Sequence, residues 1–247
     1  MNIKYLLFLM IIILTSCTTG AKIAENRIQA ESLRNLGEAY LSSGNASLAL
    51  RELLKAKALY PDDPYTHNDL GLAYLSKGRV EKAVFHLKKA IELKPDYAPA
   101  RNNLGSAYIA QQNWDKAIET LKPLTENILY TTPHFAEANI AFAYFMKKKY
   151  SIAEKHYKNS LDLAPEYTQP MRGLSILYRI KGDFKKSLKM INKAINISPM
   201  SGELYFQKGK TLEFMGENEE AKLSYQKAIS LGNDRIIEKA EEAIRKL

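Results

Sequence analysis

The sequence predicts an all-α chain in which about six helical hairpins stack into an α-solenoid that ends in a capping helix. Three columns of residues predict this fold, because each recurs at intervals near 34 residues and such a period is typical of repeat proteins. The first column holds Pro61, Pro95, Pro165 and Pro199. The second column holds Gly37, Gly71, Gly105, Ala141, Ser175 and Gly209. The third column holds Ala49, Ala83, Ala117, Ala153, Ser187 and Ala221.

The composition fits a folded chain and excludes several classes of function. The 247 residues are 46% apolar and 26% charged, which supplies enough apolar surface for a core. Cys17 is the only cysteine, so a disulfide scaffold is excluded, and the four histidines are not spaced as zinc ligands. The sequence has no phosphate-binding loop, dinucleotide fingerprint or nucleophile elbow. We therefore expect a binding protein without catalytic residues, metal or cofactor.

Residues 1–16 are predicted to be the signal peptide of a lipoprotein. Lys4 precedes a run of ten apolar residues, 5–14, which fits a secretory signal and is too short to span a bilayer, where about 20 residues are needed. The run ends in Leu14, Thr15, Ser16 and Cys17, which resembles a bacterial lipobox. This resemblance implies that a diacylglycerol is attached to Cys17 and that cleavage makes Cys17 the first residue of the mature chain.

Residues 17–29 are expected to form the lipidated amino terminus and a linker to the first repeat. Each buried methylene is worth about 0.8 kcal/mol, so several acyl chains would hold the protein on a membrane. Thr18 follows the cysteine in place of aspartate, and by resemblance to lipoproteins of two-membraned bacteria this implies the periplasmic face of the outer membrane. In a bacterium with one membrane, the same signal implies the outer face of the plasma membrane. The alternatives are an uncleaved anchor and an incidental cysteine.

Residues 30–235 resemble the tetratricopeptide repeat, whose first helix carries the pattern Leu-Gly-x2-Tyr. The pattern is present at Leu36, Leu70 and Leu104 and, with alanine in place of glycine, at Ile140. The resemblance implies two antiparallel helices in each repeat and a right-handed superhelix. The six repeats are 30–63, 64–97, 98–133, 134–167, 168–201 and 202–235, with two extra residues between the third and the fourth.

Positions 4, 7, 8 and 11 of each repeat are expected to form one core stripe, because residues at these intervals share a helix face. Glycine at position 8, as in Gly71, is expected to let the second helix approach at Ala83. Aromatic residues at positions 11 and 17 are expected to pack in the core and not to form a ligand cage. They are Tyr40, Tyr74, Tyr108, Tyr144 and Tyr178, and then Trp114, Tyr150 and Phe184. Residues 236–247 form an amphipathic helix that is expected to cap the last repeat.

A second stripe on the first helices, at positions 2, 5, 9 and 12, is predicted to bind a partner polypeptide. In the fourth repeat it is apolar without an evident need within the hairpin, and by resemblance to the family it lines the concave face. Exposed apolar patches usually have a partner, and asparagines here would hold an extended backbone. The predicted groove residues are Leu72, Leu75, Asn102, Asn103, Ile109, Phe135, Asn139, Phe142, Phe145, Met146, Ile176 and Ile180. The alternative is that superhelical curvature or the linker already covers this stripe.

Positive charge is concentrated in residues 146–200, which contain 12 basic and 4 acidic residues. Six lysines are expected on the outer face of the second helices: Lys155, Lys158, Lys185, Lys186, Lys189 and Lys193. An anionic lipid surface, an acidic partner and a solvated face all remain open, and nucleic acid is not expected because no base-stacking motif is present. On the inner face, the residues at position 5 of the repeats predict no continuous basic groove.

Residues 102–165 are similar to the pilotin lipoproteins of type IV pilus biogenesis, the PilF/PilW family. The similarity rests on Asn102-Asn103-Leu104-Gly105, on residues 121–124, on residues 129–133 and on Ala138-Asn139-Ile140-Ala141. It implies that the partner is a secretin subunit, which the protein escorts to the outer membrane and helps to assemble into a ring. The alternative is a general periplasmic adaptor that recruits cell-wall or envelope-assembly proteins. An enzyme is not expected, because no nucleophile, base and orienting group occur in a recognisable arrangement.

Overall fold

The part of the chain that the structure describes consists of α helices joined by short loops, without strands. The computed structural model describes the backbone of residues 3–126 and 130–247 and the side chains of residues 21–126 and 130–247. It divides into two compact units, residues 1–112 and 113–247, and each is described here by itself. The predicted all-α fold class is confirmed.

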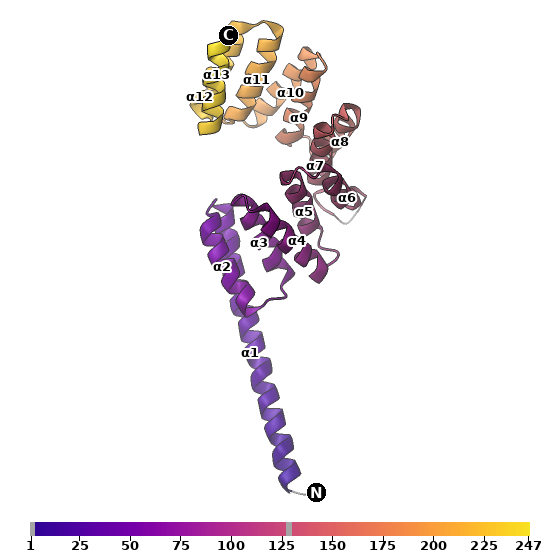
Figure 1. Ribbon diagram of the computed structural model, residues 1–247, viewed down its shortest axis with the longest axis vertical. Helices are drawn as coiled ribbons and strands as arrows, with labels where there is room; N and C mark the ends of the chain where they lie inside the picture. The colour runs from indigo at the N-terminus through magenta and orange to yellow at the C-terminus, as the bar shows by residue number, and fades with distance from the viewer. Residues whose placement is uncertain (1–2, 127–129) are drawn as a thin grey trace. The chain divides into compact units, whose positions relative to one another are not determined.

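Unit 1 contains five helices, each of which packs against the next (Figure 1). They are α1 (Ile3–Ser42), α2 (Ala46–Leu59), α3 (Pro64–Ser76), α4 (Val80–Leu93) and α5 (Ala98–Ala110). Helix α1 includes the segment that was expected to be a linker, 17–29, and the first helix of the first repeat. The side chains of the lipobox, Cys17 among them, lie outside the described residues. Among the described residues, no helix has the length and apolar character that crossing a membrane requires.

Unit 2 contains eight helices, which pack in chain order (Figure 1). They are α6 (Trp114–Thr125), α7 (Pro133–Met146), α8 (Tyr150–Leu163), α9 (Thr168–Ile180), α10 (Phe184–Ile197), α11 (Gly202–Met215), α12 (Asn218–Leu231) and α13 (Asp234–Lys246). The last helix, α13, buries Ile236, Ala240 and Ala243 in the final core cluster. It begins two residues earlier than the expected cap, because the side chain of Asn233 accepts a hydrogen bond from the backbone N–H of Ile236.

The turns within the hairpins share one backbone conformation. Gly44, Gly78, Gly182 and Gly216 have φ between +66° and +79°, which L-residues with a side chain rarely adopt. Gln112 and Lys148 occupy the same turn with φ of +58°. A residue with a β-carbon costs roughly 1–2 kcal/mol in this conformation. The turn is therefore imposed by the packing of the two helices, even where glycine is missing.

The core of each hairpin is organised around position 24 of the repeat, on the second helix. The residues there are 3% exposed or less: Leu53, Leu87, Leu121, Tyr157, Ile191 and Tyr225. A β-carbon added to Gly71 would lie 2.5 Å from Cγ of Leu87. The close approach expected at Gly71 is therefore confirmed, and Ala83 is buried there, but the atoms nearest to the glycine belong to the larger side chain of Leu87. Gly37 with Leu53 and Gly209 with Tyr225 repeat this contact.

The aromatic residues at positions 11 and 17 contribute to packing, as expected. Tyr108 and Tyr178 are buried, and Tyr40, Tyr74 and Tyr144 pack against the core clusters. Trp114, Tyr150 and Phe184 are half-buried, and each contacts another aromatic ring of unit 2.

A pair of buried histidines joins α3 to α4 in unit 1. Nδ1 of His67 lies 2.9 Å from Nδ1 of His86, and Nε2 of His67 lies 2.9 Å from the carbonyl oxygen of Pro61. The ring of Tyr74 stacks on His86. Burial lowers the pKa of His67, and burial together with the neighbouring His67 lowers the pKa of His86 to about 4. Both rings are therefore neutral at pH 7, because the folded state disfavours their charged form.

The contact between Gly71 and Leu87 predicts that Gly71→Ala destabilises unit 1. Overpacking costs about 1–3 kcal/mol, whereas alanine regains about 1 kcal/mol of helix propensity. We expect a net loss of about 1 kcal/mol in the free energy of unfolding, measured by urea denaturation. When Leu87→Ala is already present, Gly71→Ala should instead stabilise the chain by about 1 kcal/mol, because the obstructing side chain is gone. Equal effects in the two backgrounds would contradict the packing explanation.

The histidine pair predicts acid sensitivity. The pKa of His86 is about 4 in the folded chain and about 6.5 when unfolded, so its contribution to stability is present above pH 6.5 and is lost as the pH falls below that value. We expect the gap in unfolding free energy between the wild type and His86→Gln to shrink by about 3 kcal/mol from pH 7 to pH 4. The comparison is needed because burial raises the pKa of Asp69 to about 6, which changes stability in the opposite sense in both proteins. A gap independent of pH would disprove this role of His86.

Candidate functional site

The second stripe of unit 2 is a surface of partly covered apolar side chains on α7 and α9. Phe142, Phe145 and Ile176 are half-buried, and so is Asn139. Phe135, Met146 and Ile180 are more open, with exposed fractions of 38%, 43% and 51%. Ala138, which occupies the same stripe, is buried and does not contribute to the surface.

The phenylalanines of this stripe are partly used in packing. Within the α7–α8 hairpin this holds for Phe145, which corrects the expectation for that residue, whereas Phe142 packs against the preceding repeat. The ring of Phe142 meets Trp114 edge to face at 6.1 Å between centroids, and the ring of Phe145 lies 5.7 Å from Tyr150. Phe135 meets Tyr167 edge to face at 5.3 Å. These contacts hold the rings in place without burying them, so their remaining surface is presented in a fixed orientation.

A small pocket opens between α7 and α9. Its volume is about 40 Å³, and it is lined by Phe142, Phe145, Tyr157, Gln169, Arg172, Gly173 and Ile176. The pocket is large enough for the tip of an apolar side chain and too small for a drug-sized ligand, which needs some 300 Å³ or more. This arrangement fits recognition of a polypeptide through separate side chains.

A larger cavity of about 490 Å³ lies at the carboxyl-terminal end of unit 2. Arg172 of α9 lines it as well as the small pocket, so the two hollows meet at this side chain. Residues from α11 and α13, from the loops before them and from the end of α12 complete its wall. Comparing positions between repeats cannot find this cavity, because part of its wall belongs to the capping helix, which lies outside the repeats.

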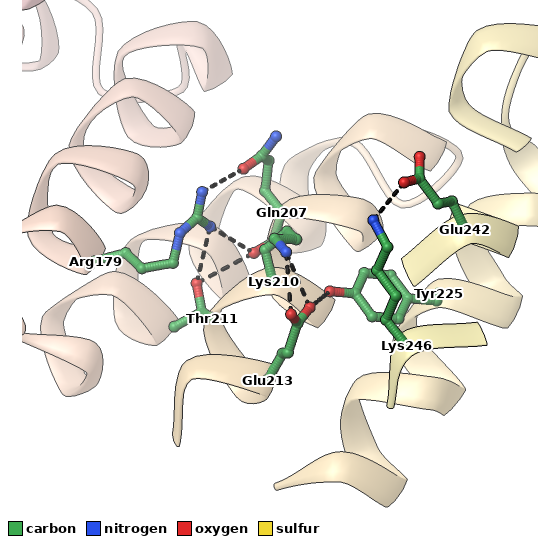
Figure 2. Close-up of polar contacts among 8 residues, drawn as sticks. All are labelled: Arg179, Gln207, Lys210, Thr211, Glu213, Tyr225, Glu242 and Lys246. Atoms are coloured by element: carbon green, nitrogen blue, oxygen red, sulfur yellow. Dashed lines mark hydrogen bonds and ion pairs between the residues drawn. The ribbon is translucent and has the colours of Figure 1, made fainter. Parts of the chain in front are cut away.

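A polar network holds α9 against α11 (Figure 2). The guanidinium of Arg179 donates hydrogen bonds to the carbonyl oxygen of Gln207 at 3.1 Å and to Oε1 of Gln207 at 3.0 Å. Thr211 also bonds to that carbonyl oxygen and accepts from Arg179. Figure 2 also shows Lys210 and the hydroxyl of Tyr225 donating to Glu213, which joins α11 to α12. Because buried polar groups are costly unless paired, this network fixes the spacing of the helices that form the groove.

The predicted groove residues of unit 1 form a more polar surface. Leu72, Leu75 and Ile109 are half-buried. Asn103 donates a hydrogen bond from Nδ2 to Oδ1 of Asn68 at 2.8 Å, and Asn68 donates to Asp69 at 3.0 Å. The amide of Asn103 thus already has a partner within the chain. Oδ1 of Asn102 is buried without a hydrogen-bond partner among the described residues, so of the two predicted asparagines it is the one with unused capacity.

All six lysines expected on the outer face are exposed. Lys158 pairs with Glu154 and Lys186 with Asp183. The other four lysines have no ion pair within the described part of the chain: Lys155, Lys185, Lys189 and Lys193.

The described residues contain no cluster of histidine, cysteine, aspartate and glutamate that could hold a metal ion.

Models of the tetratricopeptide repeat match three segments of the chain: residues 71–112, described as a TPR repeat, and residues 103–127 and 202–234, both described as a tetratricopeptide repeat. The chain is 30% identical over 93 residues to the BBSome complex member BBS4 of Bos taurus. That match covers 38% of this chain and 18% of the relative. The chain therefore spans less than a fifth of the length of this relative.

Two solved structures share the fold over most of the chain. PilW, described as a widely conserved type IV pilus biogenesis factor, has a TM-score of 0.73 and 17% identity, over 81% of this chain and 92% of PilW. PilF of Pseudomonas aeruginosa has a TM-score of 0.71 and 17% identity, over 88% of this chain and 99% of PilF. At this level of identity the likeness shows a common fold and carries no residue roles from one protein to the other.

Proposed function

Because the chain is a tetratricopeptide-repeat protein whose fold resembles those of PilW and PilF, we propose that it is a lipid-anchored scaffold that binds a partner polypeptide in the groove of unit 2. The observation that carries this proposal is the pocket between α7 and α9, where Phe142, Phe145 and Ile176 keep part of their surface open. Rings that are held in place lose little conformational freedom on binding, which favours their use as recognition sites.

The partner that we propose is a secretin subunit of the type IV pilus machinery, which the protein would escort as a pilotin. Two features support this assignment: the similarity of residues 102–165 to pilotin lipoproteins and the fold shared with two type IV pilus proteins. Leu129, one of the residues on which that similarity rests, lies outside the described residues. The more polar surface of unit 1, with Leu72, Asn102 and Ile109, would add contacts of its own.

We place the protein on the periplasmic face of the outer membrane, held there by acyl chains on Cys17. The support is the order of charge, apolar run and lipobox in residues 1–17, with Thr18 after the cysteine. In a single-membrane bacterium the anchor would lie in the plasma membrane. We also propose that the protein acts without catalysis, since scaffolding is the general role of tetratricopeptide repeats and the sequence has no catalytic arrangement.

The alternative is a general periplasmic adaptor that recruits cell-wall or envelope-assembly proteins. The observation that favours it is that part of the chain is similar in sequence to a BBSome subunit, so the repeat is not confined to pilus proteins. Cross-linking from a photoreactive residue at position 145 distinguishes the two, because the pilotin assignment requires that the cross-linked protein be the secretin subunit.

The groove predicts that Phe142→Glu and Phe145→Glu each weaken binding of the purified secretin subunit at least tenfold, because a charge placed in an apolar contact must be desolvated. Affinity is measured by biolayer interferometry, and circular dichroism checks that each variant is folded. The matched control is Ile152→Glu, which puts the same charge on an exposed apolar residue of α8 outside the groove. If both phenylalanine variants bind as tightly as the control, the groove is not the binding site.

The lipobox predicts that Cys17→Ser abolishes acylation. In cells fed a labelled fatty acid, the wild type should carry the label and fractionate with the membrane, whereas the variant should do neither.

We also expect the amount of secretin multimers to fall in the Cys17→Ser variant and in a gene deletion, as measured by immunoblotting of membrane fractions. A deletion strain with normal secretin multimers and surface pili would exclude the pilotin role while leaving the anchor untouched.

A further inference from the structure

The large cavity of unit 2 is lined by more positive than negative side chains. Arg172, Arg235 and Lys239 border it, and Glu203 is the one acidic residue among the described side chains of its wall. Arg172 pairs with Glu203 at 3.3 Å, and Gln207 donates a hydrogen bond to the same carboxylate at 2.9 Å. The charge of Glu203 is thus already compensated within the wall. The acidic residues of α13, such as Glu238 and Glu241, do not line the cavity.

Arg235 and Lys239 leave an uncompensated positive potential at the rim. Both are exposed, and among the described residues neither has an ion pair. Helix α11 begins at this wall with Gly202, and its amino terminus adds positive partial charge. Asp234, the first residue of α13, does not line the cavity, and its carboxylate opposes the partial charge of that helix's own amino terminus. A cavity with this potential attracts carboxylates, and Phe206, Leu231 and Ile236 supply apolar surface in the same wall.

The apolar pocket and the basic cavity are neighbours on the same surface of unit 2, because Arg172 lines both. Helix α7 packs against α9, and α9 packs against α11. Packed helices lie about 8–10 Å apart, and an extended chain advances about 3.3 Å per residue. A peptide that places a side chain in the apolar pocket therefore reaches the basic cavity about three residues later.

We propose that unit 2 selects a polypeptide segment in which an apolar side chain is separated by about three residues from one or two acidic side chains. The apolar residue contacts Phe142, Phe145 and Ile176, and the carboxylates pair with Arg235 and Lys239 at the rim, beside the ion pair of Arg172 with Glu203. The inference rests on the proposed function, since it names the chemistry of the segment that the groove binds. The basic cavity is distinct from the basic outer face, whose lysines lie on α8 and α10.

The test uses the full chain and a phage library of random twelve-residue peptides. Selection is carried out on the wild type and on Arg235→Glu/Lys239→Glu, which reverses the charge of two exposed residues. The matched control is Lys185→Glu/Lys189→Glu, which changes the net charge by the same amount on the outer face of α10. Consensus peptides are then synthesised with each acidic residue kept or replaced by glutamine, and their affinities are measured by fluorescence anisotropy.

We expect the wild type and the outer-face control to enrich an aromatic or aliphatic residue followed or preceded, about three residues away, by aspartate or glutamate. The rim variant should lose this acidic preference and should bind the acidic consensus peptide at least tenfold more weakly. Replacing glutamate by glutamine in the peptide should weaken binding to the wild type by a similar factor, and 0.5 M NaCl should reduce the difference.

The inference is overturned if the wild type enriches no peptide, if acidic and glutamine peptides bind equally, or if the outer-face control loses as much affinity as the rim variant. Repeating the peptide selection on Phe142→Glu distinguishes a failure of this inference from a failure of the proposed function. If acidic residues are not selected but Phe142→Glu removes binding of the apolar peptides, the groove stands and its charge preference is wrong. If Phe142→Glu changes nothing, the groove itself is wrong.

Discussion

Three of the hairpins depend on a contact between a glycine of the first helix and a large side chain of the second helix. At Gly71 a single added carbon would lie 2.5 Å from Leu87, so the two helices are as close as their backbones and this side chain permit. Glycine has a low helix propensity, and its presence here is explained by the burial of Leu87 that it allows. The same contact recurs at Gly37 and Gly209, which makes it the constraint on which these three repeats are built.

This contact decides where binding surface remains. Positions 4, 7, 8 and 11 lie toward the second helix in most repeats, although Leu36 of the first repeat is 44% exposed, so the residues at positions 2, 5, 9 and 12 are left for the other side of the first helix. In unit 2 the phenylalanines of this stripe are only partly covered, since Trp114 and Tyr150 support one edge of Phe142 and Phe145 and leave another open. The network around Arg179 then keeps α9 and α11 at a fixed spacing. A groove with fixed walls can bind an extended segment without first being ordered, which lowers the entropic cost of binding.

Much of the fold could be predicted from residue periodicity. The columns that include Gly71, Ala83 and Pro61 repeat at a fixed interval, and such an interval has few structural solutions other than stacked hairpins. The packing role of Tyr108 and Tyr178 followed from helical spacing as well. The exact partner of Gly71 did not, because Ala83 and Leu87 lie one turn apart on the same face and only the packed helices show which of them fills the space.

The candidate site was predictable in part. The apolar stripe of α7 is visible in the sequence, but whether Phe142 is free or covered depends on Trp114, which lies 28 positions away. Similarly, the asparagine pair of unit 1 looks uniform in sequence, yet Asn103 bonds to Asn68 while Oδ1 of Asn102 has no hydrogen-bond partner. Local pattern determined which helices form and which faces they bury, because helix periodicity is a property of neighbouring residues. Only the tertiary structure decided the contents of the groove and brought Arg172 to one cavity with Arg235 and Lys239, because that cavity is made by helices that the chain separates and packing unites.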